Sequence, residues 1–181
     1  MMGHVIGGEI DKMGILYERY KLPLYAYFFK LTRGDNQASE DLVHTVFYRA
    51  IRYKTSFTGQ GSFKNWLFRI AHNVGIDHHR IIRNQNGYNA EIKATQTLLY
   101  EHNDLEKNEQ RATLEKAMNK LKPCERELFI LGKIECLKYK EISDILGTTE
   151  SNVKIRIFRA LKKLKNIYTK LENTRYEKSR S

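Results

Sequence analysis

The chain has 181 residues, a length that admits one domain or two small ones. It carries 32 Lys and Arg residues against 21 Asp and Glu residues, and the formal net charge of +11 attracts polyanions at long range. Nucleic acid is therefore the leading class of partner, and a soluble protein with a solvated basic surface is the alternative. No apolar run approaches the roughly 18 residues that span a bilayer, and the opening MMGHVIGG lacks the pattern of a secretory signal. We expect a cytoplasmic protein with no membrane insertion.

The cysteines and the spacing of apolar residues restrict the fold class. Cys124 and Cys136 are too far apart for a Cys-x-x-C pair, and we expect both to be ordinary buried or half-buried thiols. Apolar residues recur with helical spacing along most of the chain, whereas alternating apolar and polar runs are scarce. The sequence therefore predicts an all-α fold.

Changes in composition divide the chain into segments. Residues 10–83 hold most of the aromatic residues, including the only tryptophan, Trp66, and this indicates a separate hydrophobic core. Residues 84–108 are polar, and we interpret them as a flexible linker with one weak helix. Residues 109–171 predict a second helical block. Residues 172–181 form a basic tail that we expect to be frayed from Asn173 onward.

The segment at residues 39–52 has the pattern of an amphipathic helix. Ser39 is its predicted N-cap, and Glu40 and Asp41 lie in the first turn, where the helix dipole favours acidic residues. One half of the helical wheel is apolar: Leu42, Val43, Val46, Phe47, Ala50 and Ile51. The other half is polar or aromatic: Asp41, His44, Thr45, Tyr48, Arg49 and Arg52. This second half is either a binding surface or an ordinary solvated surface.

The segment at residues 63–83 predicts a longer amphipathic helix. Its core face comprises Phe63, Trp66, Leu67, Ile70, Ala71, Val74 and Ile81. Its outward face comprises Asn65, Arg69, His72, Ile76, His79, Arg80 and Arg83. These amide, cationic and imidazole groups suit DNA phosphates and base edges better than proton transfer. A metal site at His72, His78 and His79 is the alternative, but His78 and His79 diverge by about 100° along a helix and the sequence supplies no convincing further ligand.

A glycine-containing loop at residues 53–62 precedes this helix. It holds Gly59, Gly61, several short polar side chains and one aromatic residue, Phe57. A loop of this composition is suited to stack on or enclose an unpaired base, as in proteins that bind unstacked nucleotides. The alternative is a turn whose Phe57 packs inward, and the sequence does not separate the two.

The pattern near the C-terminus is that of a helix-turn-helix. Residues 139–146 predict a short helix that ends at a left-handed Gly147, and Thr148 or Thr149 caps a longer second helix. Pro123 suits the first position of a scaffold helix that precedes this motif. The core stripe of the second helix comprises Val153, Ile157, Ala160, Leu161, Leu164 and Leu171. Its outward face, with Ser151, Asn152, Ile155, Arg156, Arg159 and Lys163, is free to enter a major groove, unless the motif is an ordinary helical hairpin.

Signatures of enzymes are absent from the sequence. We find no phosphate-binding loop, nucleophile elbow, zinc-ligand spacing or pair of catalytic carboxylates. A nuclease or recombinase would need clustered acids or a hydroxyl nucleophile with basic partners, and neither is evident. We therefore expect a protein that is not an enzyme and that binds no cofactor and no metal.

The order of these segments resembles a known family. The stretches ASEDLVHTVFYRAIRY, FTGQGSFKNWLFRIAHNVGIDHHR and LKPCERELFILGKIECLKYKEISDILGTTESNVKIRIFRALKKLK are similar to those of extracytoplasmic-function sigma factors, a compact class of sigma factors of bacterial RNA polymerase. The resemblance covers about residues 13–83 and 109–170. It implies two small helical domains, a region 2-like bundle at 10–83 and a region 4-like helix-turn-helix domain at 109–171, joined by the linker at 84–108 and followed by the tail at 172–181.

The resemblance also implies partners and the residues that bind them. Core RNA polymerase is expected to dock on the outer face of the first segment, at Glu40, Asp41, His44, Thr45 and Tyr48. The minus-ten promoter element, as duplex and as melted strand, is expected to contact Phe57, Lys64, Asn65, Arg69, His72, Asn73, Ile76 and Arg80. The minus-thirty-five element is expected to contact Ser151, Asn152, Lys154, Arg156 and Arg159. An anti-sigma factor is a further candidate partner, and the linker is similar to the segment that threads toward the RNA exit channel.

Two departures from the family's usual sequence affect these expectations. His44 and Thr45 stand where Gln and Glu are more common, so the docking face is less acidic than usual. Cys136 occupies an inter-helix position that is often glycine, and a left-handed backbone there should cost about 1 kcal/mol relative to glycine. The remaining alternative function is a helix-turn-helix regulator that binds duplex promoter DNA without core polymerase.

Overall fold

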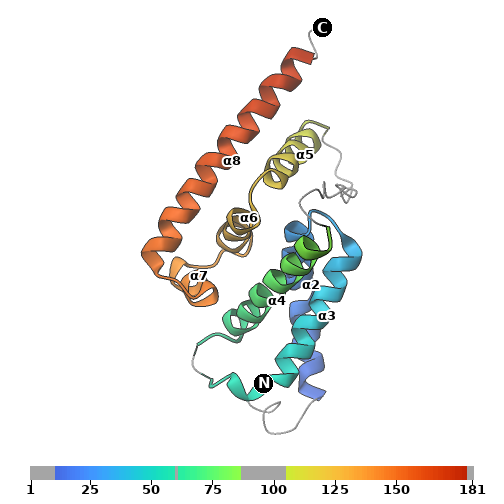
Figure 1. The fold of residues 1–181 in the computed structure, drawn as a ribbon, viewed down its shortest axis with the longest axis vertical. Coiled ribbons are helices and arrows are strands. Elements are labelled where there is room, and N and C mark those ends of the chain that lie inside the picture. The colour runs from blue at the N-terminus through green and yellow to red at the C-terminus, as the bar shows by residue number, and fades with distance from the viewer. Residues whose placement is uncertain (1–10, 60, 87–104, 179–181) are drawn as a thin grey trace.

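The computed structural model describes residues 11–59, 61–86 and 105–178, which form two helical units. The N-terminal unit comprises α2 (Asp11–Leu31), α3 (Asn36–Arg52), the 3-10 helix η1 (Lys54–Ser56) and α4 (Phe63–Asn86). The C-terminal unit comprises α5 (Leu105–Asn119), α6 (Pro123–Phe129), the π-helical turn η3 (Ile130–Ile134), α7 (Tyr139–Leu146) and α8 (Glu150–Lys178). These ranges contain no strand, and the all-α prediction is confirmed (Figure 1).

Most of the predicted linker, in which one weak helix is expected, lies outside the described residues. The two ends of the linker are helical, because α4 continues to Asn86 and α5 begins at Leu105.

The N-terminal unit is built around the faces that α2, α3 and α4 turn toward one another. Leu24, Phe28, Val46, Leu67 and Ala71 are buried in this core. Apolar burial of this kind contributes about 25 cal/mol per Å² and is the main force that holds such short helices in place. A Cβ atom on Gly75 of α4 would lie 3.0 Å from Leu31 Cδ2 of α2, so the two helices pack directly against each other there.

The predicted start of α3 is wrong. The helix begins at Asn36, and Asp35 is its N-cap, with a side-chain oxygen that accepts a hydrogen bond of 2.9 Å from Ala38 N. Ser39 is instead fully buried, and its hydroxyl donates to the Asp35 carbonyl. Asp35 and Ser39 are both good capping residues, and the position of the preceding turn at Thr32 to Gly34 selects Asp35.

Two predicted core positions are also wrong. Ile51 and Ile81 are 39% and 52% exposed; Ile51 is the last residue but one of α3, and Ile81 lies in the last two turns of α4. Conversely, the predicted core stripe omits Phe68, which is fully buried. Its ring packs edge-on against that of Tyr27 of α2, with ring centroids 5.6 Å apart.

The local signals of the helix-turn-helix are confirmed. Gly147 ends α7 in the left-handed conformation, with φ 63° and ψ 40°. Thr149, rather than Thr148, caps α8, because its hydroxyl accepts a hydrogen bond from Asn152 N at 3.3 Å. Pro123 is the first residue of α6. Cys136 has φ 53°, the left-handed conformation that its position suggested, but Cys124 and Cys136 are both exposed, so the prediction of buried or half-buried thiols is wrong.

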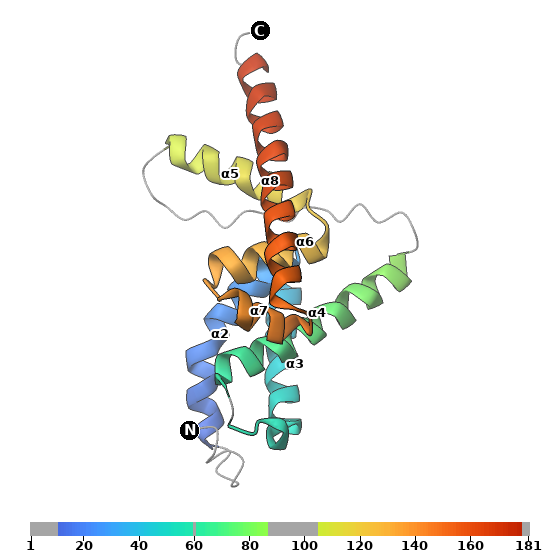
Figure 2. The ribbon, with the colours of Figure 1, turned by 90° about the vertical axis from the view of Figure 1, so that its left-hand side faces the viewer.

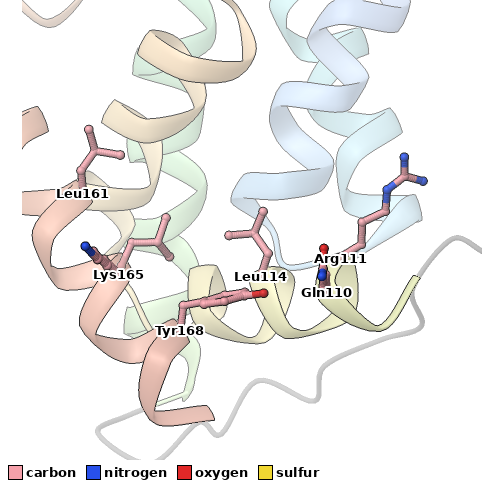
Figure 3. A pocket seen from close by; sticks show the side chains of 7 residues that line it. Gln110, Arg111, Leu114, Leu161, Lys165 and Tyr168 are labelled. Carbon is pink, nitrogen blue, oxygen red and sulfur yellow. The ribbon is translucent and has the colours of Figure 1, made fainter. Parts of the chain in front are cut away.

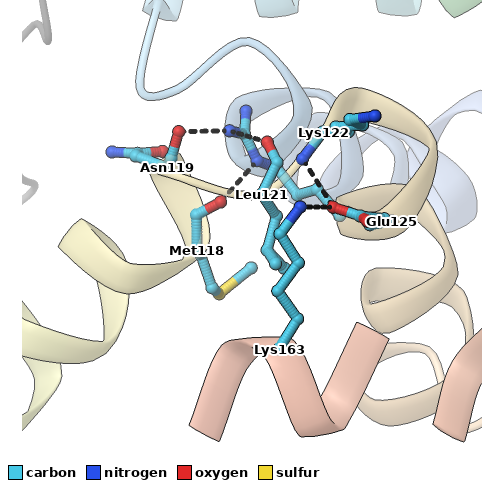
Figure 4. A network of polar contacts seen from close by, with 7 residues as sticks. Met118, Asn119, Leu121, Lys122, Glu125 and Lys163 are labelled. Carbon is cyan, nitrogen blue, oxygen red and sulfur yellow. Dashed lines mark hydrogen bonds and ion pairs between the residues drawn. The ribbon is translucent and has the colours of Figure 1, made fainter. Parts of the chain in front are cut away.

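Arg126 joins α5, α6 and the end of α2. It is 1% exposed and donates hydrogen bonds to the carbonyls of Met118, Asn119 and Leu121 at 3.0, 3.0 and 3.3 Å (Figure 4). It also donates to the carbonyl of Leu31 at 3.1 Å. Carbonyls at a helix C-terminus lack hydrogen-bond donors within the helix, and the Arg126 guanidinium donates to them instead. Burial, together with the nearby positive charge of Arg33, lowers the pKa of Arg126 to about 10.

A second polar contact fixes α8 against α6. Lys163 Nζ lies 2.7 Å from a Glu125 carboxylate oxygen, and the other contact of that carboxylate is the backbone N–H of Lys122 at 2.9 Å (Figure 4). Burial acts to raise the pKa of Glu125, but the two hydrogen bonds outweigh it and hold that pKa below its ordinary value.

The predicted fraying of the tail is wrong as far as Lys178. Helix α8 runs without interruption from Glu150 to Lys178, and Arg175 near its end forms an ion pair with Glu109 of α5. Helix α5 packs along α8, so the contact with α5 supports a helix that the charged sequence alone does not predict.

The two units pack against each other. Helix α7 lies beside α4, and α6 and η3 lie beside α2, as Figures 1 and 2 show from two directions. The buried apolar residues of both units belong to one continuous cluster. Three helices of the N-terminal unit and the helix-turn-helix are therefore held in a defined relative position.

Candidate functional site

The predicted protein-docking face lies along the outer side of α3. Asp41, His44 and Tyr48 are exposed, with Tyr48 at 65%, whereas Thr45 is half-buried and donates a hydrogen bond of 2.8 Å to the Asp41 carbonyl. Glu40 is exposed beside them. Residues 41, 45 and 48 follow helical spacing, so their side chains form one stripe opposite the buried residues of α3. The structure thus brings the five predicted docking residues together on one surface.

The loop before α4 directs Phe57 inward. The Phe57 ring is half-buried, with its centroid 5.8 Å from that of Phe63 and 5.5 Å from that of Trp66. Trp66 Nε1 donates to the Ser56 hydroxyl at 3.2 Å and ties the loop to α4. Of the two interpretations that the sequence left open, the structure has the one in which Phe57 packs against its own domain.

The predicted DNA-contacting residues of α4 divide between two faces of the helix. One group is exposed and points away from the rest of the molecule: Arg69, Asn73, Ile76 and Arg80. Ile76 is 50% exposed among these polar residues. Arg80 pairs with Asp77 of its own helix, at 3.2 Å, and Asp77 also binds Arg49 of α3 at 2.8 Å.

The other group, Lys64, Asn65 and His72, contacts acidic residues of the C-terminal unit. Lys64 Nζ lies 3.2 Å from a carboxylate oxygen of Glu135 in the segment after η3. Asn65 Nδ2 donates to Glu141 of α7 at 3.2 Å, while Asn65 Oδ1 is buried without a hydrogen-bond partner in the structure as described. His72 Nδ1 lies 2.7 Å from Glu127 of α6. We call Glu127, Glu135 and Glu141 the acidic surface.

Glu127 is the most deeply placed member of the acidic surface. It is 9% exposed, and the same oxygen that contacts His72 accepts a hydrogen bond of 2.5 Å from the hydroxyl of Tyr27. Tyr27 is 1% exposed, and burial together with the negative charge of Glu127 raises the pKa of its phenol well above the ordinary value. The buried Glu127 carboxylate of α6 thus contacts both the phenol of Tyr27 on α2 and the imidazole of His72 on α4.

The predicted DNA-reading face of α8 is accessible. Ser151, Asn152, Lys154 and Arg159 are exposed in its first turns, and Arg156 is half-buried at the edge of the face. The side chain of Asn152 donates to the Thr148 hydroxyl at 2.8 Å. Val153 and Ile157 are buried behind this face and anchor the helix to the unit.

Ile155 and Phe158 are further residues of this face. They are 51% and 68% exposed, although both are large and apolar, and they alternate with the polar residues along the outer side of α8. The sequence analysis places Ile155 on the outward face and assigns Phe158 to neither face, although a helical wheel sets Phe158 on the same side as Ser151 and Ile155.

The remaining histidines do not assemble into a metal centre. Burial lowers the pKa of His78, and nearby Asp35 only partly opposes this effect. Among the residues that the structure describes, no group of three or more His, Cys, Asp or Glu side chains is arranged to hold a metal ion. In the same residues, every helix is too short or too polar to cross a membrane.

A groove of about 530 Å³ lies between α5 and α8, away from the predicted DNA-contacting residues (Figure 3). Its lining is largely apolar, from Leu114, Leu161, Leu164 and Tyr168, with Gln110, Arg111 and Lys165 at its border. Leu114 is 37% exposed in it. The sequence analysis does not identify this groove, because it forms only where α5 crosses α8.

Comparison with known families assigns both units. Residues 16–84 match the model of sigma-70 region 2, and residues 111–164 match that of sigma-70 region 4. The chain is 30% identical to the RNA polymerase sigma factor YlaC of Bacillus subtilis over 165 residues, which cover 88% of this chain and 94% of that protein. It is 29% identical to the ECF RNA polymerase sigma factor BldN of Streptomyces coelicolor over 166 residues, which cover 87% of this chain but only 60% of BldN.

The fold also matches that of solved proteins. The sigma factor RpoE of Bartonella quintana, crystallised with the anti-sigma factor NepR, superposes with a TM-score of 0.72 at 24% identity, over 87% of this chain and 97% of that one. CnrH, solved in complex with the cytosolic domain of CnrY, superposes with a TM-score of 0.67 at 22% identity, over 92% and 93% of the two chains. At these identities the comparison concerns the fold alone.

Proposed function

Because this chain belongs to the extracytoplasmic-function sigma factors of bacterial RNA polymerase, we propose that it carries core polymerase to specific promoters through the residues described above and helps to open them. The observation that carries the proposal is the placement of exposed basic and polar side chains on α4 of region 2 and on α8 of region 4 within one chain. A regulator that acts without polymerase would need only one of these faces.

Helix α8 is the proposed reader of the minus-thirty-five element. Its N-terminal turns present Ser151, Asn152, Lys154, Arg156 and Arg159, and the motif leaves this end of the helix free to enter a major groove. Lys and Arg at such positions supply phosphate attraction that weakens with salt, whereas Asn and Arg distinguish base edges. Ile155 and Phe158 add apolar surface suited to the methyl group of thymine.

Helix α4 and the loop before it are the proposed minus-ten site. Arg69, Asn73, Ile76 and Arg80 offer cationic, amide and apolar contacts along an exposed face. Opening of the strands is thermal in this proposal, and the loop then holds an unstacked base rather than forcing it out. For Phe57 to stack on that base, its ring must leave Phe63 and Trp66, so we propose that Phe57 supports the loop until DNA binds.

The outer face of α3 is the proposed docking site for core polymerase. Tyr48 supplies the apolar anchor, and Glu40 and Asp41 supply charge at its border, the arrangement usual for the centre and rim of a protein interface. His44 is stacked on Tyr17 of α2, with ring centroids 6.4 Å apart, so the ring is held in place on this face.

An anti-sigma factor is a further proposed partner, and the apolar groove between α5 and α8 is the surface that we propose for it. In every one of these roles the chain binds and positions other molecules, so no reaction needs to be catalysed by its own side chains. We propose that it acts in the cytoplasm, where its polymerase and DNA partners are found.

Run-off transcription tests the proposed function. Core RNA polymerase is assayed on a promoter library with and without this protein. Initiation at specific sequences only when the protein is present supports the proposal, and the enriched sequences define the two promoter elements. If core polymerase neither binds nor responds while the protein alone retains specific duplexes, the regulator function replaces it.

A further inference from the structure

We propose that an unpaired base of the melted minus-ten strand stacks on the ring of Tyr53, with the Arg52 guanidinium beside that ring. The inference deepens the proposed function and rests on it, because it names the residue by which the loop before α4 holds the base. Tyr53 is not among the residues that the resemblance implies for this element. Its side chain is 50% exposed where α3 ends and the loop toward α4 begins (Figure 2).

The loop at residues 53–62 has two aromatic rings, and only one of them is accessible to a base. Phe57 is half-buried against Phe63 and Trp66, at centroid distances of 5.8 and 5.5 Å. A base that stacked on Phe57 would have to separate these rings first. Half of the Tyr53 side chain is open to solvent, so a base can stack on it while Phe57 stays in place.

Hydrogen bonds fix the backbone of Tyr53 on both sides. Its N–H donates to the Arg49 carbonyl at 2.8 Å, and its carbonyl accepts from the backbone N–H and the hydroxyl of Ser56 at 2.9 and 2.7 Å. The same hydroxyl accepts a hydrogen bond of 3.2 Å from Trp66 Nε1 of α4. Because tyrosine has few side-chain torsions, a Tyr53 ring on this fixed backbone loses little conformational entropy when it binds.

Arg52 gives the Tyr53 ring a cationic neighbour. The guanidinium carbon lies 5.8 Å from the ring centroid, within the range of a cation–π contact. Arg52 is exposed, and a guanidinium can donate two parallel hydrogen bonds to the oxygens of one phosphate. The pair therefore offers an aromatic face to a base and a cation to the phosphate of the same strand, the combination with which proteins bind single-stranded nucleic acid.

Acidic residues are absent from the chain on either side of Tyr53. Residues 42–76 contain no Asp or Glu, and their five cationic side chains are those of Arg49, Arg52, Lys54, Lys64 and Arg69. Asp77 and Glu135 approach from outside this segment and form ion pairs with Arg49 and Lys64. Arg52 and Arg69 are exposed, so a strand that passes from Tyr53 along α4 meets a positive potential.

Tyr53 lies apart from the proposed docking face for core polymerase. Five residues separate it from Tyr48, which places the two side chains about 140° apart around the axis of α3. Tyr48 belongs to the stripe that includes Asp41, whereas Tyr53 lies at the end of α3 that continues into the loop. Replacement of Tyr53 should therefore change the affinity for DNA and leave the affinity for polymerase unchanged.

The test uses core polymerase loaded with this protein and a single-stranded oligonucleotide that carries the minus-ten sequence selected by transcription. Tyr53→Leu and Tyr53→Gln remove the ring, one with an apolar and one with a polar side chain, so that a folding defect in one leaves the other to decide. Tyr53→Phe and Tyr53→Trp keep an aromatic face. Tyr139→Leu is the matched control, because Tyr139 is 39% exposed at the start of α7 in region 4.

The variants without a ring should bind the oligonucleotide about tenfold more weakly than wild type, which is within the range measured for one base stacked on an aromatic side chain. Tyr53→Phe, Tyr53→Trp and Tyr139→Leu should bind it as wild type does. An abasic site placed at each position in turn locates the base. At the stacked position it should cost wild type affinity but cost Tyr53→Leu little.

Arg52→Gln separates the contribution of charge from that of stacking. A phosphate contact releases counterions, so its loss should reduce the slope of log affinity against log salt by about 0.7 for a single strand. Stacking is an uncharged contact, and Tyr53→Leu should keep the wild-type slope. An unchanged slope in Arg52→Gln would show that Arg52 does not bind a phosphate of this strand.

Either of two results would overturn the role of Tyr53. One is wild-type binding of the oligonucleotide by both variants without a ring, and the other is a loss that is traced to weaker binding of core polymerase by those variants. Run-off transcription with wild-type protein tests the proposed function separately. Promoter-specific initiation by wild type together with wild-type behaviour of Tyr53→Leu rejects the role of Tyr53 alone, whereas a wild-type protein that neither binds core polymerase nor directs initiation rejects the proposed function as well.

Discussion

The phenol of Tyr27 donates a hydrogen bond of 2.5 Å to the carboxylate of Glu127, a residue one hundred positions later in the chain. The pair joins α2 of region 2 to α6 of region 4, and both side chains are buried. One such contact links the folding of two units that family models match separately. Its consequences for stability can be measured directly.

Replacement of Tyr27 by Phe should remove a pH dependence of stability in alkaline solution. The raised pKa of Tyr27 means that the folded protein keeps its phenol proton above pH 10, while the unfolded chain loses it near that ordinary value. Stability should therefore be unaffected by this group below about pH 10 and fall as pH rises from there toward the raised pKa. Urea unfolding of wild type and Tyr27→Phe at pH 8 to 11 measures the difference.

Arg126 changes the pH dependence of stability in the opposite direction, so the effect of Tyr27 must be taken from the difference between wild type and Tyr27→Phe. Its pKa of about 10 lies below the ordinary 12.5, so the folded protein releases this proton first and stability gains as pH rises through that range. A slope that is the same in wild type and Tyr27→Phe would show that the Tyr27 phenol is not buried against Glu127.

Replacement of Arg126 by Met should destabilise the protein by about 2–5 kcal/mol, because buried carbonyls at the ends of α5 and α2 lose their donor. Chemical denaturation gives the free energy of unfolding. Arg175→Met is a suitable control, since it also removes an Arg that bonds α5 but from an exposed position. Similar losses in the two variants would contradict the role assigned to Arg126.

Replacement of Cys136 by Gly should stabilise the protein by about 1 kcal/mol, because glycine adopts the left-handed conformation without the steric cost of a Cβ atom. For a protein of this size the melting temperature should rise by about 2–4 °C. Cys136→Ala removes the thiol but keeps the Cβ atom, and it should show no such rise. A rise in melting temperature in both variants would show that loss of the thiol, and not loss of the Cβ atom, stabilises the protein.

Replacement of Phe158 by Ala should weaken binding to the minus-thirty-five duplex by about 1–3 kcal/mol if the ring contacts a thymine methyl group. Uracil in place of each thymine in turn removes that methyl and keeps the base pair. At the contacted position the uracil substitution should cost wild type affinity but cost Phe158→Ala little. If the losses of affinity caused by Phe158→Ala and by uracil simply add at every position, the ring does not contact a thymine methyl group.

Replacement of Tyr48 or Asp41 by Ala should reduce affinity for core polymerase while leaving the fold unchanged, since both side chains lie on the exposed face of α3. Aromatic anchors dominate interfaces, so we expect more than 1 kcal/mol for Tyr48 and about 1 kcal/mol or less for Asp41. Leu22→Ala is the matched control, because Leu22 is 69% exposed on α2 and is not part of the predicted docking face. Unchanged binding in both α3 variants would move the docking site elsewhere.

The sequence by itself determined the local elements, because their signals act over a few residues. Gly147 ends α7 and Thr149 caps α8 through contacts within one turn, and the apolar stripe of α8 follows from helical spacing. The local signal was not sufficient at the start of α3, where the sequence analysis predicts Ser39 as the N-cap but the structure has Asp35 in that position and buries Ser39.

The tertiary structure decided the rest, because it depends on residues that are distant in the chain. The wheel of α4 has an apolar side and a polar side, but it cannot show that Lys64, Asn65 and His72 face another domain. That arrangement requires Glu127, Glu135 and Glu141 to be brought back across a linker, at separations of 55 to 76 residues for these pairs. Such contacts depend on the packing of two complete units, and no local pattern in the sequence records them.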